Sequence, residues 1–461
     1  MPSARRWVRP AELIALGAVV VLAALLRVVG SGSGLPLPLL NPDEANIVPR
    51  AWELVHGGGL DPGWYDYPSL LFLLLAPTQI GLDQPSYGSA RVVAIGLGLV
   101  GVVVAWWLGR LTVGRFSAAV CALVVAVATT HVAYSRMAVT DIALSVGVTA
   151  CLALLVAGRL EWAGLAAGLA ASAKYPGVLL LVPLAVAGFG AWRRLALSVV
   201  LAVAAFLATS PFVVLRADDA WDDFSRVQSL ARDGWLGFED DPPTPLAYGV
   251  RVWETVGPVA LVAVLGLVVM LRRRRPSDAI LLSFAGVYGL SLLGSSAHFD
   301  RYVLPLVPVL AVLATRVPPL AIATALAAVV PLWWAADDAR TLATRDARLD
   351  AAAWVDANVP PAERLAADPS TLPLTGRPVT RLELPGPGRT FDVDRDLARL
   401  RARGVQWLVV GGSVTDRVLA AAGDYPREAR FYRSLDALTP AFAVKGRQGR
   451  ASRPWLAIYR I

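Results

Sequence analysis

The chain has little cysteine, histidine, methionine, lysine or charge. Its 461 residues include 2 cysteines, 3 histidines and 3 methionines, and only 17% are charged, against about 25% in soluble domains. Cys121 and Cys151 both lie in apolar runs, so we expect core residues and no disulfide framework. Because 56% of the residues are hydrophobic and the apolar runs are long, the composition excludes an ordinary soluble protein. It predicts a polytopic membrane protein.

Arginine supplies almost all of the positive charge, since the only lysines are Lys174 and Lys445. A net charge of +8 could suit nucleic acid, but the arginines stand in short clusters at the ends of apolar runs. This is the usual pattern of residues that orient membrane spans, so we predict no nucleic-acid partner. The first apolar run follows Arg5, Arg6 and Arg9 without a small-residue cleavage site, which predicts an uncleaved first span.

Eleven apolar stretches suit membrane spans. They cover residues 11–29, 91–109, 116–132, 141–157, 161–173, 176–190, 195–213, 256–271, 279–294, 302–315 and 317–335. The fifth and sixth could instead be one broken helix. A twelfth stretch, 69–82, is too short for a hydrocarbon layer of roughly 30 Å, so we expect an interfacial helix there.

With this assignment every basic cluster falls on one side, which the positive-inside rule makes cytoplasmic. We therefore expect a protein of the cytoplasmic membrane with its N-terminus inside. Residues 1–335 would form the membrane domain, whose outer loops are 30–90 and 214–255. Residues 336–461 would form a small extracytoplasmic α/β domain, because strand candidates at 405–410 and 455–459 flank a helix candidate at 415–422.

Two adjacent carboxylates, Asp43 and Glu44, follow the first span directly. A carboxylate at the membrane surface can take a proton from a hydroxyl group, and low-dielectric surroundings can tune its basicity. The alternative is that Asp43 caps a helix beginning at Glu44.

Other polar residues gather at the same predicted outer ends of spans, where ionisable groups are costly and favour a site. Charges are also tolerated at span ends, and arginine side chains can extend to the surface there. Converging cations could hold a phosphate, and the three histidines, including His56, could bind a metal but share no short ligand spacing. The polar residues at the predicted outer ends of the spans are Asp43, Glu44, Arg91, His131, Arg136, Asp141, Lys174, Tyr175, His298, Asp300, Arg301 and Tyr302.

Five segments in this order resemble the GT-C membrane glycosyltransferases that use polyprenyl-phosphate sugars, especially the protein O-mannosyltransferase and lipid A aminoarabinose transferase branch. They are Asp43-Glu44, the segment 67–72, the turn 134–141 with its Ser-Arg-x-x-x-x-Asp pattern, the glycine- and alanine-rich stretch 164–174, and 301–305 with its Arg-Tyr-x-x-Pro pattern. Arg91 corresponds to the arginine that opens the family's next span. Tyr67 and Ser69 stand where the family has histidine and a second proline.

The resemblance implies that Asp43 is the catalytic base and that Glu44 and Asp141 position substrates. It implies that Arg91, Lys174 and Arg301 hold the donor phosphate. The remaining candidates, Tyr67, His131, Arg136, Tyr175, His298 and Tyr302, would line the site.

We therefore expect an inverting transferase that moves mannose or another monosaccharide from a polyprenyl phosphate to a hydroxyl of a protein or glycan. One base suffices, because a phosphate leaves as an anion that cations stabilise, whereas glycosidases must protonate a poor leaving group. No cofactor or metal is required, although Asp43, Asp141 or the histidines could hold a divalent ion. Two alternatives are open. The chain could be a scaffold that presents the C-terminal domain, or it could be a transporter or flippase, a class that commonly has internal repeats and ionisable residues near mid-bilayer.

Overall fold

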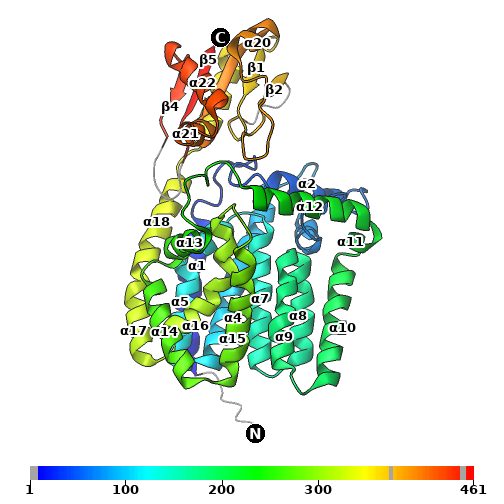
Figure 1. Cartoon of the computed structure of the whole chain (residues 1–461), viewed down its shortest axis with the longest axis vertical. Helices are drawn as coiled ribbons and strands as arrows, with labels where there is room; N and C mark the ends of the chain where they lie inside the picture. The colour runs from blue at the N-terminus through cyan, green and yellow to red at the C-terminus, as the bar shows by residue number, and fades with distance from the viewer. Residues whose placement is uncertain (1–8, 373–376, 447–452) are drawn as a thin grey trace.

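The computed structural model describes residues 9–372, 377–446 and 453–461, so Arg5 and Arg6 of the first basic cluster lie outside the described residues. A bundle of roughly parallel helices carries a small sheet-containing domain at one end. The described part of the chain begins at the opposite end of the bundle from that domain, where α1 starts (Figure 1).

The bundle alternates long helices with short ones. Its elements are α1 (Pro10–Val28), α2 (Glu44–Glu53), α3 (Leu70–Leu75), η1 (Ala76–Gln79), α4 (Tyr87–Thr112), α5 (Arg115–Val127), α6 (Thr129–Tyr134), α7 (Thr140–Val156), α8 (Leu160–Ala173), η2 (Tyr175–Leu180), α9 (Leu181–Ala187), α10 (Trp192–Thr209), α11 (Phe212–Leu215), α12 (Ala217–Asp233), α13 (Thr244–Val256), α14 (Val259–Arg273), α15 (Pro276–Leu292), η3 (Asp300–Leu306), α16 (Val307–Ala314), α17 (Pro318–Ala327) and α18 (Val329–Ala343).

A helix occupies each apolar stretch that the sequence predicts as a span. Among the described residues, however, only 4 helices are long and apolar enough to cross a membrane, or up to 5 if the pair α13 and α14, bent by 111°, is one span. The count of eleven spans therefore stays a prediction. The stretch at 69–82 forms the short helices α3 and η1, which bury Leu71, Phe72 and Leu75 completely.

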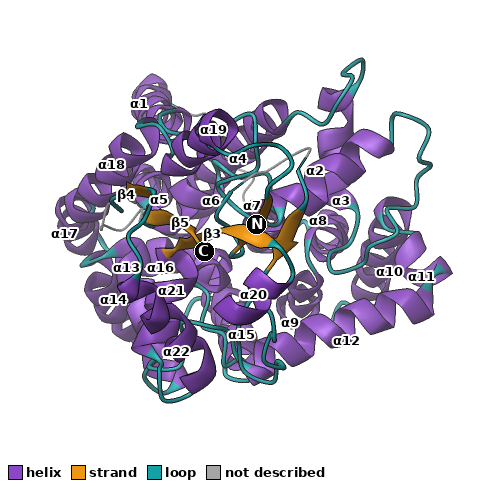
Figure 2. Ribbon diagram, turned by 90° about the horizontal axis from the view of Figure 1, so that it is seen from above, coloured by secondary structure: helices purple, strands orange, loops and turns teal. Residues whose placement is uncertain are grey.

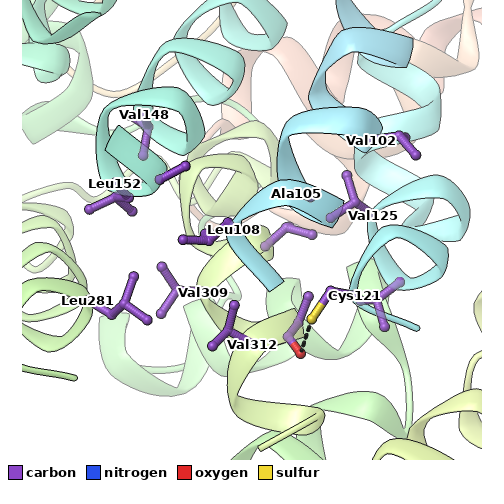
Figure 3. Packing of buried hydrophobic residues seen from close by; sticks show 14 of the residues in the cluster. Val102, Ala105, Leu108, Cys121, Val125, Val148, Leu152, Leu281, Val309 and Val312 are labelled. Atoms are coloured by element: carbon purple, nitrogen blue, oxygen red, sulfur yellow. Dashed lines mark hydrogen bonds between the residues drawn. The ribbon is translucent and has the colours of Figure 1, made fainter. Parts of the chain in front are cut away.

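The bundle core is built from small and branched apolar side chains of α4, α5, α7, α15 and α16 (Figure 3). Cys121 and Cys151 are free and buried in it, as predicted. Helices α8 and α10 approach closely through Gly164 and Gly168, since a Cβ on either glycine would come within 2.1 Å of a backbone oxygen of α10. Such close backbone contact is how membrane helices gain packing energy.

The C-terminal domain is an α/β unit, as predicted. A five-stranded sheet, whose strands are orange in Figure 2, has the order β2-β1-β3-β5-β4, with β1, β2 and β3 parallel and β5 antiparallel to β3 and β4. Its elements are α19 (Ala347–Asn358), β1 (Arg364–Ala367), β2 (Val379–Arg381), α20 (Leu397–Ala402), β3 (Val405–Gly411), α21 (Gly412–Ala420), α22 (Pro426–Ser434), η4 (Leu435–Ala437), β4 (Phe442–Val444) and β5 (Leu456–Arg460). The boundary expected after residue 335 falls inside α18.

Candidate active site

Asp43 immediately precedes α2 at the end of the bundle nearest the α/β domain (Figure 1). It occupies the N-cap position, but its carboxylate makes no capping hydrogen bond. Instead, Oδ2 accepts a hydrogen bond of 3.0 Å from the Tyr67 hydroxyl. The side chain of Asp43 is partly exposed, so this carboxylate is oriented by Tyr67 while it stays accessible. The capping interpretation is therefore wrong.

Lys174 and Asp141 form the second part of the site. Asp141 lies in the first turn of α7 and Lys174 follows α8, and Nζ of Lys174 lies 2.6 Å from Oδ1 of Asp141. The same ammonium group lies 5.3 Å from the ring centre of Tyr67 and 5.6 Å from that of Tyr302. These are cation–π distances. Tyr67 thus contacts both Asp43 and this cation.

Arg301 brings a second cation from η3. Its Cζ lies 4.4 Å from the ring centre of Phe299 and 5.9 Å from that of Tyr302, and its charge lies within electrostatic reach of Asp43 and Asp141. Among the residues that the structure describes, the buried Nε of Arg301 has no hydrogen-bond partner. This combination leaves the guanidinium with donor capacity next to the two carboxylates.

Two further site groups, Asp300 and Tyr134, are bonded to each other. Oδ1 of Asp300 accepts from the Tyr134 hydroxyl at 2.9 Å and from the backbone N–H of Arg301 at 2.8 Å. Burial raises the pKa of Asp300 above its usual value. The sequence pointed to Asp300 by its position, whereas Tyr134 was missed because an aromatic residue beside the Ser-Arg turn reads as packing.

Burial and the charge of Asp43 raise the pKa of Tyr67 well above its usual value. The phenol therefore stays protonated over the working range of pH and acts as a donor to Asp43.

Glu44 and Arg91 form a buried, two-point ion pair. The Arg91 Nη2 and Nε atoms lie 2.7 and 2.9 Å from the two carboxylate oxygens, and its Nη1 donates to the carbonyls of Ser31 and Ser33 at 2.8 Å. Glu44 also accepts from the backbone N–H of Ala138 at 3.0 Å. With exposures of 0% and 1%, the pair does not fit the substrate and phosphate roles expected from the sequence. It positions the loop that carries Asp43.

Breaking this pair should destabilise the fold. We expect Glu44→Gln or Arg91→Met to lower the free energy of unfolding by about 3–5 kcal/mol, because either change leaves an uncompensated buried charge. Thermal unfolding of the purified protein in detergent measures the effect. The double variant should be more stable than the sum of the single losses implies. Single variants that melt like the wild type would contradict the assignment.

Three other predicted site residues bond to groups outside the cluster around Tyr67 and Tyr302. His131 and Arg136 are fully buried; Nδ1 of His131 lies 2.8 Å from Arg27 Nη2, and Arg136 Nε donates to the Leu26 carbonyl at 3.1 Å. His298 bonds Asp241 at 2.9 Å. Each of the three side chains thus makes a structural contact, and the prediction that they line the site stays a prediction.

The histidines do not converge either, since His56 stacks on Trp52 with ring centres 4.0 Å apart. Within the described ranges, no three His, Cys, Asp or Glu side chains are grouped as a metal site.

An acid-lined hollow of about 500 Å³ lies beside the segment that carries Tyr67. Tyr175 borders this region, because its hydroxyl donates to the Tyr65 carbonyl at 2.8 Å. Asp66 lies between Tyr65 and Tyr67; burial raises its pKa, Arg226 opposes that shift, and the charge of Asp43 adds to it. The feature of the sequence that points to this hollow is the group of aspartates in the loop 214–255. The hollow is lined by Asp61, Gly63, Tyr65, Arg216, Asp219, Asp222 and Asp223.

Comparison with protein-family models decides what kind of protein carries this site. Residues 64–296 match the model of glycosyltransferase family 87. The chain belongs to this family. The matched region contains Tyr67, Asp141 and Lys174, and the match identifies a glycosyltransferase rather than the transporter, flippase or scaffold that the sequence left open.

Solved structures show the same GT-C fold. The archaeal oligosaccharyltransferase AglB of Archaeoglobus fulgidus, in complex with an inhibitory peptide and a dolichol-phosphate, is 14% identical with a TM-score of 0.61; the match covers 95% of this chain and 73% of AglB. ArnT of Cupriavidus metallidurans bound to undecaprenyl phosphate is 15% identical with a TM-score of 0.59, covering 98% of each chain. No curated protein matches the chain. This family 87 enzyme is thus a membrane glycosyltransferase with the GT-C fold.

Proposed function

We propose that the enzyme transfers a monosaccharide, mannose or another, from a polyprenyl phosphate to a hydroxyl of a protein or glycan, with inversion at the anomeric carbon. The observation that carries the proposal is the convergence of one accessible carboxylate, Asp43, with two cations, Lys174 and Arg301, around Tyr67 and Tyr302. These groups come from parts of the sequence far apart, and the fold brings them to one end of the bundle.

In the proposed step the acceptor oxygen attacks the anomeric carbon as its proton passes to Asp43. Tyr67 holds Oδ2 of this carboxylate, so we assign Oδ1 as the proton acceptor. The bond from the anomeric carbon to the phosphate oxygen breaks, and the polyprenyl phosphate departs as an anion. Lys174 and Arg301 stabilise the charge that develops on it. A single displacement inverts the anomeric configuration and uses no metal.

The lipid-linked donor is supported by the ligands of the structural neighbours, dolichol-phosphate in AglB and undecaprenyl phosphate in ArnT. We further propose the cytoplasmic membrane as the location, with the N-terminus inside and the α/β domain outside. That orientation, like the eleven spans, follows from the distribution of arginine.

The test is transfer in proteoliposomes that contain the purified enzyme. Radiolabelled polyprenyl-phosphate mannose should donate its sugar to added envelope glycan or protein, whereas the matching nucleotide sugar should not, and NMR of the product should show the inverted linkage. Transfer from the nucleotide sugar alone, or retention of configuration, would overturn the proposal. Mass spectrometry of the envelope of a deletion strain would identify the acceptor.

Tyr67→Phe tests the orientation of the base. Because a hydrogen bond to a charged group is worth about 1.5–3 kcal/mol, its loss should lower kcat by about 10- to 100-fold. Tyr175→Phe is the matched control, since its hydroxyl donates to a backbone carbonyl and not to a carboxylate among the described residues; we expect a much smaller loss. Equal effects of the two substitutions would contradict a special role for Tyr67.

A further inference from the structure

Residues 234–242, between α12 and α13, form a segment that we call the bridging loop, because it touches both the α/β domain and the bundle. Gly234 and Gly237 have φ values of 101° and 98°, a conformation that favours glycine and lets the loop turn sharply. Between them, Leu236 is 1% exposed and belongs to the buried cluster of the α/β domain, with Leu408 and Val414 among its members. The loop is thus anchored in the core of that domain.

Polar and aromatic contacts reinforce this anchor. The Tyr425 hydroxyl donates to Oε1 of Glu239 at 2.6 Å, and Cζ of Arg389 lies 4.8 Å from the ring centre of Trp235. Both Tyr425 and Arg389 belong to the α/β domain. Trp235, Leu236 and Glu239 therefore each attach the bridging loop to that domain.

On its other side the bridging loop contacts the residues just before Arg301. The ring of Phe299 lies 5.0 Å from that of Phe238 and 6.1 Å from that of Trp235, both as edge contacts. His298 is held next to it, because Nδ1 bonds Oδ2 of Asp241 at 2.9 Å. The loop thus fixes both residues that lead into η3.

Phe299 carries this constraint into the site. Its ring lies 4.4 Å from Cζ of Arg301 and 5.6 Å from the ring of Tyr302, and the Tyr302 ring lies 5.6 Å from the ammonium of Lys174. A continuous series of contacts therefore joins Leu236, in the α/β domain core, to both cations of the site.

We propose that the α/β domain positions the donor-binding cations through the bridging loop, with Leu236 as the anchor and Phe299 as the positioning residue for Arg301. This rests on the proposed function, in which Arg301 and Lys174 hold the donor phosphate. The domain then has a role in donor use that does not require it to touch the donor.

Leu236→Ala in the full-length enzyme is the main test. We expect the KM for polyprenyl-phosphate mannose to rise by about 2- to 30-fold, the range of effects seen along coupled networks, with the acceptor KM unchanged. Leu236→Met, which keeps an apolar side chain of similar size, should leave the donor KM at the wild-type value. Leu400→Ala is the matched control, because this leucine belongs to the same cluster but lies on α20. It should lower the melting temperature without changing the donor KM.

A double-variant cycle adds a second readout. Phe299→Ala should raise the donor KM by itself, and adding Leu236→Ala should raise it little further, because both changes interrupt one series of contacts. If the Leu236→Ala protein does not insert into the membrane, Tyr425→Phe and Glu239→Gln can be used in its place. Each should raise the donor KM by a smaller factor, and the double variant should raise it no further than one single variant does. An unchanged donor KM, equal effects of Leu236→Ala and Leu400→Ala, or full additivity would overturn the inference alone. A wild-type enzyme without transfer from the lipid donor would overturn the proposed function, and this inference with it.

Discussion

Asp43→Asn is expected to lower kcat by about 10²- to 10⁴-fold, the range attributed to general-base catalysis. The amide keeps the size of the carboxylate and can still accept the Tyr67 hydrogen bond, but it cannot take the acceptor proton. Because Asp43 does not itself pair with Lys174 or Arg301 through a hydrogen bond, the KM for the donor should change little. Transfer rates in proteoliposomes at saturating donor and acceptor measure the effect.

Asp83→Asn is the control for this experiment, since Asp83 lies in the same loop, residues 30–90, and is exposed. We expect wild-type rates from it. If Asp43→Asn and Asp43→Ala both keep rates near the wild type while the protein inserts normally, Asp43 is not the base.

Arg301→Ala should have the second largest effect, a loss in kcat of about 10²- to 10³-fold, as for the removal of a group that stabilises developing negative charge. Lys174→Ala should act in the same direction. Both losses arise because the departing phosphate oxygen gains charge as the sugar leaves. Arg301→Lys should recover part of the activity, since it keeps the charge but not the planar donor geometry.

Arg345→Ala provides the comparison for both cation variants. Arg345 is 68% exposed in its side chain and pairs with Asp350 at the surface, so its loss should leave transfer unchanged. Inhibition by added undecaprenyl phosphate gives an independent readout, which should weaken in Arg301→Ala and Lys174→Ala. Unchanged inhibition in both would remove them from the phosphate site.

The sequence predicted that Asp43, Tyr67, Asp141, Lys174 and Arg301 lie at one end of the bundle, and the structure brings these side chains close together. Tyr67, Asp141 and Arg301 stand at the start of an apolar run, whereas Asp43 and Lys174 follow one. The positions of the runs therefore predict at which end of the bundle these residues lie. The two ends of a helix are thus readable from composition alone.

The sequence does not predict in the same way which side of a helix faces the site. Arg91 lies on α4, which has apolar residues on nearly every side, and His131 lies on the 6-residue helix α6, which is too short to show a period. The sequence pattern therefore does not show which face of either helix meets the site. The partners that neutralise or bond them, Glu44 and Arg27, are 47 and 104 residues away in sequence. Only the packed structure identifies those contacts.

The α/β domain shows the same contrast. Strands β3 and β5 were predicted because their apolar runs are long, whereas β2 and β4 have three residues each and give no such pattern.

Proline changes where the α-helices of the bundle begin. Pro176 and Pro305 lie in the 3-10 helices η2 and η3, so the α-helices in these two apolar stretches begin later than the stretches themselves.

The scarcity of lysine gives the enzyme an unusual chemical property. Lys174 is 9% exposed and ion-paired, whereas Lys445 follows β4 and is exposed. An amine-selective dye should therefore mark one side chain on the α/β domain in the native sequence, without any engineered cysteine, once the N-terminal amine has been blocked. The distance from that dye to labelled lipid would then report how high the domain stands above the bilayer during turnover.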